Sequence, residues 1–415
     1  MNNKLQKYNS YKNSGVEWLG EIPEHWEAKK IKFLFSVGRG RVIAQTELIE
    51  NGLYPVYSSQ TQDNGVLGHI NTFDFDCNQI TWTTDGANAG TVFLREGKHN
   101  CTNVCGTLQP YNKNQVIEFV TYSLQVAAQF YKRPDTNGAK IMNGEMAEIF
   151  VTLPPFSEQT AIAKFLDDKT TKIDQAITIK KNQIELLKER KHSLINKAVT
   201  KGINHNVKLK ASGVEWIGQI PEHWQVKRLK YVFQILKRIS GEIGHNVLSI
   251  TQKGIKVKDT ESGAGQLSMD YSKYQFVYKG DFAMNHMDLL TGYVDISKYD
   301  GVISPDYRVF DLIEPNSNKE YMLLLLQLCY SNKVFYAHGQ GVSMLGRWRF
   351  PSENFNIFPF PVPPKSEQIE IADFIAKTNK KIATAISLKE KEIDKLKEYK
   401  ASLINSAVTG KVKVF

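Results

Sequence analysis

Histidine and cysteine are the side chains in this sequence that most often form metal or catalytic sites. His99, Cys101 and Cys105 lie close together in the chain, and Cys77 could supply a fourth ligand. Their spacing matches no common zinc pattern, and four cysteines in a chain of this size do not indicate a disulfide framework. We therefore expect no metal site and no disulfide scaffold.

Catalytic motifs can be tested one by one. Adenine-N6 methyltransferases carry Asn/Asp-Pro-Pro-Phe/Tyr, in which the first residue accepts a hydrogen bond from the target amino group. The Pro-Pro-Phe triplet here follows Leu153, and the matching Pro-Pro pair later in the chain follows Val362. Neither side chain can accept that hydrogen bond. No Walker sequence or nucleotide-binding glycine loop occurs, and no acidic-x-Lys follows Pro305-Asp306 as a nuclease would need. We expect a chain with no catalytic residues and no bound cofactor of its own.

Composition limits the class of protein. The chain has 415 residues, 41% of them hydrophobic and 23% charged, which is typical of a folded protein of two or three domains. The formal net charge of +10 favours a polyanionic partner without identifying one. The N-terminus lacks the apolar core of a signal peptide, and the most apolar run, Tyr321 to Tyr330, is too short to cross a bilayer. We expect a cytoplasmic protein with no membrane partner.

A long internal repeat organises the chain. Lys12 to Phe35 reads KNSGVEWLGEIPEHWEAKKIKFLF, and Lys210 to Phe233 reads KASGVEWIGQIPEHWQVKRLKYVF. We call each of these segments a leader and expect its Trp, Pro and His side chains to form an apolar clamp. His25 and His223 have no Ser, Cys or Asp partner at suggestive spacing in both copies, so we expect them to be structural.

A second repeated segment predicts two long helices. Pro154 to Thr200 and Pro363 to Thr409 both start Pro-Pro-x-Ser-Glu-Gln, with prolines outside, a serine able to cap and Glu-Gln in the first turn. Apolar residues then recur at three- and four-residue spacing, as in a coiled coil. The expected seam of the helix pair consists of Leu166, Ile173, Ile177, Ile184, Leu187, Leu194, Ile375, Ile382, Ile386, Ile393, Leu396 and Leu403.

Lysines interrupt the seam at matching places, namely Lys180 and Lys191 in the first copy and Lys389 and Lys400 in the second. One interpretation is that their charges extend past the seam to solvent. The other is that they fix the register of the pair. The sequence leaves both open.

The blocks between leader and helix, about Ile31 to Leu153 and Leu229 to Val362, diverge almost completely. Both indicate short strands with turns and one or two helices. Their middles align by pattern, which places Gly90 opposite Gly292. Different polar loops on one scaffold are where recognition usually lies.

These loops and the basic residues near them supply the candidate DNA contacts, since arginine and amide side chains suit phosphates and base edges. For any one basic residue, a solvated surface position is an alternative explanation. The candidates are Arg39, Arg41, Thr83, Thr84, Asp85, Asn88, Arg133, Lys253, Lys256, Asn285, His286, Asp288, Arg347 and Arg349.

The leader SGVEWLGEIPEHW, the PPxSEQ helix starts and the segments Asp295–Gly301 and Ser304–Tyr307 resemble the specificity subunits of type I restriction-modification systems. The resemblance covers essentially the whole chain. It implies an α+β protein with two tandem α/β target recognition domains, separated by two long antiparallel coiled-coil helices in a pseudo-twofold internal repeat. It also implies that each recognition domain reads one half of a bipartite site in double-stranded DNA, and that the helices set the gap.

The same resemblance implies the partners: two methyltransferase subunits and the restriction subunits, which would bring S-adenosylmethionine, ATP and Mg²⁺. We expect the first recognition domain at residues 1–155, the first helix at 156–202, the second recognition domain at 203–364 and the second helix at 365–415. The alternatives are a specificity subunit of a related methyltransferase-nuclease of the type IIB kind, or another DNA-binding coiled-coil adaptor. Sequence-dependent DNA affinity would separate these from a purely structural protein.

Overall fold

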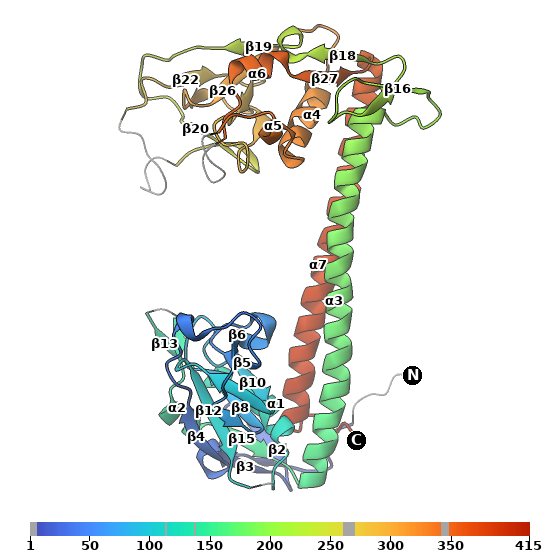
Figure 1. The fold of residues 1–415 in the computed structure, drawn as a ribbon. Coiled ribbons are helices and arrows are strands. Elements are labelled where there is room, and N and C mark those ends of the chain that lie inside the picture. The colour runs from blue at the N-terminus through green and yellow to red at the C-terminus, as the bar shows by residue number, and fades with distance from the viewer. Residues whose placement is uncertain (1–5, 113, 137, 260–269, 342–347) are drawn as a thin grey trace. The chain divides into compact units, whose positions relative to one another are not determined.

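The structure is a computed structural model that describes residues 6–112, 114–136, 138–259, 270–341 and 348–415. The chain divides into two compact units (Figure 1). Unit 1 comprises Met1–Lys181 and Lys389–Phe415, and unit 2 comprises Asn182–Leu388. Each unit therefore combines one recognition block with a stretch of both long helices.

Unit 1 is built on two four-stranded sheets. In the first sheet all neighbours are antiparallel, and its order is β10 (Val92–Arg95), β8 (Gln79–Thr83), β12 (Cys105–Pro110) and β4 (Phe35–Arg39). The second has the order β6 (Val66–Ile70), β5 (Tyr54–Tyr57), β11 (Lys98–Cys101) and β7 (Phe75–Asp76), and its β5–β11 pair is parallel. Helix α1 (Ile117–Ala127) packs against β10. The short elements are α2 (Asn143–Glu148), η2 (Gln45–Glu47), η3 (Gln62–Gly65) and η4 (Ala128–Phe130).

Unit 2 contains a counterpart of the first sheet of unit 1, but its remaining strands are paired differently. Its four-stranded sheet is antiparallel, in the order β19 (Phe233–Leu236), β26 (Arg308–Leu312), β23 (Phe282–Met284) and β24 (Val294–Ile296). Two further strand pairs are β20 (Leu248–Thr251) with β21 (Gly254–Val257) and β22 (Gln275–Val277) with β25 (Gly301–Ile303). The helices of this block are α4 (Lys319–Ser331), α5 (Val334–Ala337) and α6 (Ser352–Ile357). This mixture of antiparallel sheets and separate helices confirms the α+β class.

The alignment of Gly90 with Gly292 also matches the backbone. In unit 1 the N–H of Thr83 donates to the carbonyl of Thr91, and in unit 2 the N–H of Asn285 donates to that of Tyr293. The same turn therefore closes the same strand pair in both blocks.

Each leader forms a constant frame around its recognition block. The strands are β1 (Tyr11–Asn13), β2 (Glu21–Pro23) and β3 (Glu27–Lys30) in unit 1 and β16 (Leu209–Ala211), β17 (Gln219–Pro221) and β18 (Gln225–Arg228) in unit 2, followed by η1 (Ile31–Phe33) and η5 (Leu229–Tyr231). The block returns through β15 (Phe150–Leu153) or β27 (Pro359–Val362), which pairs antiparallel with β3 or β18.

The two ends of each recognition block are joined by the same hydrogen bond. The N–H of Ile31 donates to the carbonyl of Ile149 at 2.9 Å, and the N–H of Leu229 donates to that of Phe358 at 2.9 Å. Each variable block is therefore a closed loop that enters and leaves an unchanging frame at one point.

The long helices are α3 (Phe156–Lys201) and α7 (Lys365–Val408), and both begin directly after the Pro-Pro pairs. They run antiparallel, because Lys180 of α3 pairs with Glu392 of α7 while Asp174, farther back in α3, pairs with Lys400. Of the expected seam, Leu166, Ile173, Ile177, Ile184, Ile375, Ile382, Ile393 and Leu403 are buried, and Leu187, Leu194, Ile386 and Leu396 are half-buried. The 3–4 spacing therefore predicted the packed face.

Two of the seam lysines cross to the partner helix. The Nζ of Lys180 lies 2.6 Å from a carboxylate oxygen of Glu392, and that of Lys400 lies 2.6 Å from Asp174. Exposed ion pairs contribute only about 0–1 kcal/mol, so their main effect is on register. For the other two seam lysines, Lys389 and Lys191, the repeat places Gln183 and Ala383 where the acidic partners would be. Lys389 instead pairs within its own helix with Glu392 at 3.1 Å. The register interpretation fits Lys180 and Lys400.

A Glu at the start of each long helix binds the leader, which gives a structural reason for the repetition of both motifs within the chain. In unit 1 a carboxylate oxygen of Glu158 lies 2.7 Å from Nε2 of His25, and the indole N–H of Trp26 donates to the other at 2.9 Å. In unit 2 Glu367 binds His223 and Trp224 in the same way, at 2.5 Å and 2.9 Å. The histidines therefore have a structural partner, as expected.

The next residue, Gln, ties the helix start to the recognition block. The side chain of Gln159 accepts from the N–H of Val116, which caps α1, and donates to the carbonyl of Pro154. Gln368 does the same with Asn318, the cap of α4, and with Pro363. The serine expected to cap lies inside the first turn, and Glu and Gln hold the helix start instead.

The leader also holds the end of a long helix. Gly410 follows α7 with a φ of +72°, and a Cβ placed there would lie 2.3 Å from Pro23 and 3.1 Å from Trp26. Gly202 follows α3 with a φ of +75° and lies against Trp224 in the same way. A left-handed glycine is the usual way to end a helix, and here it also lets the leader tryptophan approach. The expected apolar clamp is thus present in both units.

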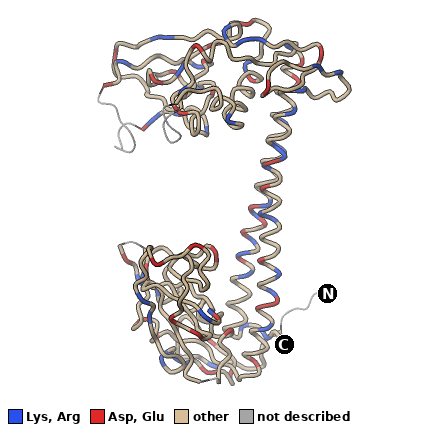
Figure 2. The backbone as a smooth tube through the Cα atoms, viewed as in Figure 1, with Lys and Arg blue, Asp and Glu red and all other residues tan. Residues whose placement is uncertain are grey.

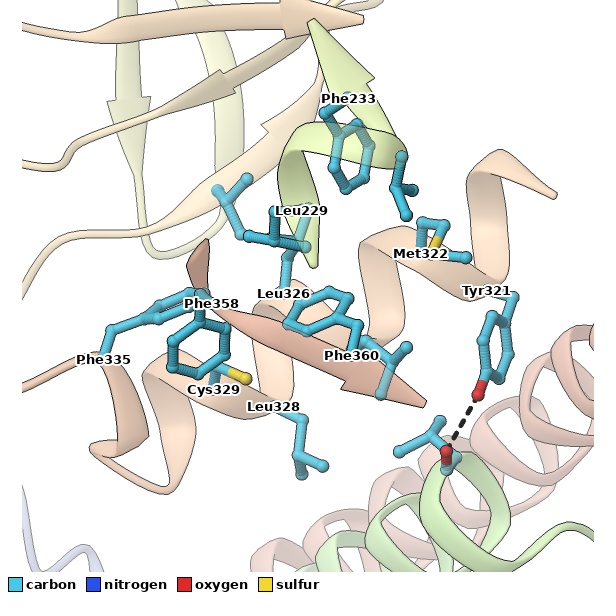
Figure 3. Packing of buried hydrophobic residues seen from close by; sticks show 14 of the residues in the cluster. Leu229, Phe233, Tyr321, Met322, Leu326, Leu328, Cys329, Phe335, Phe358 and Phe360 are labelled. Carbon is cyan, nitrogen blue, oxygen red and sulfur yellow. Dashed lines mark hydrogen bonds between the residues drawn. The ribbon is translucent and has the colours of Figure 1, made fainter. Parts of the chain in front are cut away.

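The core of unit 2 reaches the end of α3 through one tyrosine. Tyr321 of α4 is fully buried, and Figure 3 shows its hydroxyl directed at the carbonyl of Val199, with a hydrogen bond of 2.9 Å. Tyr321 belongs to the same buried hydrophobic cluster as Leu229, Phe233, Met322, Leu326 and Phe360 (Figure 3). In unit 1 the corresponding carbonyl of Val408 receives a hydrogen bond from Thr152 instead.

We expect Tyr321→Phe to destabilise unit 2 by about 1–3 kcal/mol, because it leaves the buried carbonyl of Val199 without its hydrogen-bond donor. A protein of two units does not give a single free energy of unfolding, so hydrogen exchange measured peptide by peptide is the suitable readout. Exchange should accelerate in α4 and at the end of α3. Tyr399→Phe, at a side chain that is 56% exposed, is the control, and equal exchange in both variants would contradict the assignment.

Candidate nucleic-acid interface

A three-stranded ribbon collects several of the candidate residues of unit 1. Its strands are β13 (Arg133–Asp135), β14 (Gly138–Lys140) and β9 (Asp85–Gly86). The register places both Arg133 and Asp85 opposite Lys140. Gly138 makes the close approach possible, because its φ is +129° and a Cβ there would lie 2.8 Å from the backbone of Gly86. The ribbon therefore presents Asp85, Arg133 and Lys140 together.

Asn88 lies in the turn that follows β9. It is exposed, and its Nδ2 donates to the carbonyl of Ser59 at 3.1 Å. The turn is thereby joined to the segment between β5 and β6, which was not among the candidates. One contiguous polar surface results from the ribbon, the turn and this segment.

Thr83 and Thr84 do not belong to that surface. They are 1% and 0% exposed, and Thr84 donates its hydroxyl hydrogen to the carbonyl of Val104. We correct the candidate set by leaving them out, because both side chains are buried and the Thr84 hydroxyl is already bonded within the protein. Their role is to support the strand from which Asp85 and Asn88 extend.

The arginines of unit 1 are largely occupied by protein groups. Arg41 pairs with Glu47 at 2.8 Å and with Asp74 at 3.1 Å, and Arg133 pairs with Glu145 at 2.5 Å. Arg39 donates to the carbonyl of Asn103. The hydrogen bond that Arg41 donates to the carboxylate of Glu47 raises the pKa of Arg41. Pairing with carboxylates reduces the attraction of Arg41 and Arg133 for phosphate in the conformation described. Arg39 is exposed and bonded to neutral groups, so it stays a candidate phosphate contact.

The two candidate lysines of unit 2, Lys253 and Lys256, lie on a hairpin. Lys253 occupies the turn between β20 and β21, Lys256 lies on β21, and both side chains are exposed. Arg349 is exposed and its backbone pairs with Gln340. Arg347 lies outside the described residues. These positions can supply phosphate contacts, which position a protein on DNA without reading its sequence.

The expected polar loop of unit 2 is a tight turn. The Oδ1 of Asp288 accepts hydrogen bonds from the N–H groups of Leu290 and Thr291, both at 3.0 Å, and that of Asn285 accepts from Met287. Burial lowers the pKa of His286 to about 4, with further contributions from Arg308 and Arg349. His286 is therefore neutral near pH 7 and cannot act as a cation toward phosphate. Asn285 and Asp288 hold the turn more than they offer free contacts.

Two buried arginines could not be predicted from the sequence. Arg95 in unit 1 is 1% exposed and Arg308 in unit 2 is 4% exposed. Arg308 donates to the carbonyl of Phe350 at 2.8 Å, and at the matching place in unit 1 the indole of Trp82 donates to the carbonyl of Ile141 at 2.9 Å. Arg308 is thus a structural substitute for a tryptophan.

The residues considered for a metal site have other partners. The two ring nitrogens of His99 lie 2.8 Å from the amide of Gln79 and 2.8 Å from the carbonyl of Gly97. Burial raises the pKa of the Cys105 thiol to about 11 and also raises that of Cys101. Within the described ranges no cluster of three or more His, Cys, Asp or Glu side chains could hold a metal ion.

Charge is distributed over the molecule rather than gathered in one place. Figure 2 shows lysine and arginine in both units and interspersed with acidic residues along α3 and α7. None of the helices described is both long and apolar enough to span a bilayer.

Two variable blocks in identical frames, joined by an antiparallel helix pair, define the architecture, and a family model agrees with it. The model for the type I restriction modification DNA specificity domain matches residues 23–189 and again 221–398. The chain belongs to this family. Each match begins in a leader, covers one recognition block and extends into one long helix, so the specificity domain occurs twice.

Individual relatives agree with the family assignment. The chain is 28% identical to the type I restriction enzyme MjaVIII specificity subunit of Methanocaldococcus jannaschii over 95% of this chain and 94% of that one. It is 34% identical to the type I restriction enzyme MpnII specificity subunit of Mycoplasma pneumoniae over 39% of this chain, which is 51% of that relative. One match thus spans nearly the whole chain and the other is local.

Solved structures of specificity chains share the fold. One solved structure concerns complex assembly and conformational transition of the type I restriction-modification system. A chain of that structure aligns with this protein with a TM-score of 0.67. The alignment covers 93% of this chain and 98% of that one, at 10% identity. At so low a sequence identity, the alignment shows a shared fold and nothing about function.

Proposed function

We propose that this protein is the sequence-reading subunit of a type I restriction-modification enzyme. The observation that carries the proposal is the duplicated frame: the same Glu-His-Trp and Gln contacts hold two recognition blocks whose surfaces differ. A frame whose main contacts are repeated suits two copies of one partner protein. Blocks that differ suit two different half-sites in double-stranded DNA.

The proposed partners follow from the same contrast: the frame contacts are repeated, whereas the two recognition blocks differ. Two methyltransferase subunits bind this chain, one for each frame, and restriction subunits complete the enzyme. S-adenosylmethionine, ATP and Mg²⁺ belong to those partners. This chain contributes DNA recognition and assembly and no catalytic group, in agreement with Leu153 and Val362 at the positions where a methyltransferase needs a hydrogen-bond acceptor.

We expect the purified chain alone to transfer no methyl group to DNA, because it offers no acceptor for the target amino group. With the methyltransferase subunits of its host added, methylation of adenine should appear at one bipartite motif. Incorporation of a labelled methyl donor, followed by sequencing of the methylated positions, measures both. Robust methylation or cleavage by the single chain would contradict the proposal, as would methylation by the complex that follows no fixed motif.

A further inference from the structure

The segment between β5 and β6 of unit 1, residues 58–65, carries a run of exposed polar side chains. Thr61, Gln62, Asp63 and Asn64 are consecutive and exposed. Among the residues that the structure describes, none of these four side chains is hydrogen-bonded. Amide side chains such as those of Gln62 and Asn64 present a donor and an acceptor together, the pattern that matches the edge of adenine in the major groove.

The backbone of this segment is held in an unfavourable conformation. Asp63 has φ 48° and ψ 41°, and Asn64 has φ 54° and ψ 29°. Both are left-handed. Asn and Asp adopt this conformation more often than other residues that carry a side chain, but it is uncommon even for them, and two in succession are rarer. Such conformations persist only where the surrounding structure enforces them, and they concentrate at functional sites.

Arg95 is the residue that enforces it. Its Nη1 donates to the carbonyl of Asn64 at 2.7 Å, and its Nε donates to the hydroxyl of Thr81 at 3.0 Å. The guanidinium is sandwiched between the rings of Tyr57, at 3.6 Å, and Phe93, at 4.3 Å. A Cβ at Gly65 would lie 2.9 Å from its Nη2. The arginine thus fills the space directly beneath the segment.

Burying a charged side chain costs desolvation free energy, and one hydrogen bond to a carbonyl does not account for that cost. Arg95 is 1% exposed, burial lowers its pKa, and no carboxylate among the described residues forms an ion pair with it. Well-packed apolar groups usually give a domain equal or greater stability at such a place. Stability alone therefore does not account for this residue, whereas fixing the shape of an exposed loop does.

Further contacts join the segment to the polar surface already described. Besides the bond from Asn88 to Ser59, the hydroxyl of Thr102 donates to that of Ser58 at 3.1 Å, and Gln60 donates to the carbonyl of Val66. The segment, the Asn88 turn and the β9–β14–β13 ribbon are thereby one continuous surface of unit 1.

The described residues of unit 2 do not contain this arrangement. Strand register aligns Val92 with Val294, because they pair with Trp82 and Met284 at the same level of the sheet. The position of Arg95 then corresponds to Ser297, which donates its hydroxyl to the carbonyl of Tyr299. The arginine-held segment is therefore particular to the first recognition domain.

We propose that residues 58–65 form the base-reading element of the first recognition domain, and that Arg95 is its positioning residue. The ligand is the major-groove edge of duplex DNA, contacted by Gln62 and Asn64. This inference rests on the proposed function and assigns its first half-site to these residues.

The test is to map the methylated motif of the complete complex containing Gln62→Ala, Asn64→Ala or Arg95→Met. Gln62→Ala and Asn64→Ala should each reduce discrimination at one base pair of the first half-site by about 10- to 100-fold. Arg95→Met should relax every position that this segment reads. The second half-site should stay unchanged in all three variants.

Two control variants separate reading from folding. Trp82→Phe removes a buried hydrogen bond from the same domain away from the segment, so it should lower the melting temperature without changing the motif. Gln252→Ala changes an exposed amide in unit 2 and should leave the first half-site unchanged. If Arg95→Met fails to fold, the two exposed alanine variants still decide the matter.

The inference is overturned if both alanine variants keep the wild-type first half-site, or if Arg95→Met loses methylation evenly with an unchanged motif, as Trp82→Phe should. Those results would leave the proposed function intact. A wild-type complex that follows no fixed motif would instead overturn the proposed function and this inference with it.

Discussion

Replacing residues 31–149 with the corresponding block of a relative should change one half of the recognised motif completely and leave the other half as it was. The block is closed by the hydrogen bond from Ile31 to Ile149 and leaves the frame beside the strand through which it entered. A substituted block therefore needs only the same two ends. Sequencing of methylated positions in cells that carry the chimera measures the outcome.

The matched chimera exchanges the second block, at the equivalent bond between Leu229 and Phe358. It should change the other half-site only, and its overall methylation should stay close to that of the parent. If either chimera changed both halves together, the two blocks would not be independent readers. A chimera that assembles with the partners but keeps the parent motif would place recognition outside the blocks.

Lengthening both long helices by seven residues should widen the unread gap of the motif by about three base pairs. The insertions belong after Lys180 in α3 and before Glu392 in α7, because these residues pair across the helices. Seven residues add roughly 10 Å at about 1.5 Å per residue, and one base pair occupies about 3.4 Å of the duplex axis. A seven-residue repeat also keeps the apolar seam in phase to within about 20°. Both half-sites should be unchanged.

Two controls accompany this experiment. The same insertion in α3 alone leaves its seam residues without partners, so it should impair assembly. The same seven residues placed in the exposed turn at Glu96 and Gly97 should leave the gap unaltered. An unchanged gap in the double-insertion variant, with methylation retained, would show that the helices bind partners without setting the spacing.

The helices were the most predictable part of the structure. Their apolar residues recur every three or four positions, and a proline pair fixes where each begins, so the expected starts at 156 and 365 coincide with α3 and α7. The segment expected to end at 415 contains a helix that ends at Val408, because the left-handed Gly410 stops it. Gly410 alone did not predict where the helix ends, because the sequence does not show that Trp26 packs against this position.

The recognition surface was much less predictable. All five residues of β8 are buried, so the strand shows no alternation that could have placed Thr83 inside, and the polar character of Thr84 suggested exposure. The exposed segment at 61–64 reads as an ordinary turn before Gly65. Nothing in the sequence connects it to Arg95, because the contact depends on how two sheets fold over one another.

The first and the last residues that the structure describes meet within unit 1. The N–H of Lys413 donates to the carbonyl of Gln6 at 2.7 Å, and the rings of Tyr8 and Phe415 lie 6.5 Å apart. Fluorescent dyes attached at Lys7 and Val414 would therefore transfer energy efficiently while unit 1 is folded and lose that transfer when it opens. Unit 2 contains neither end, so its unfolding would leave the signal unchanged, and the pair of dyes would report on one half of an otherwise duplicated molecule.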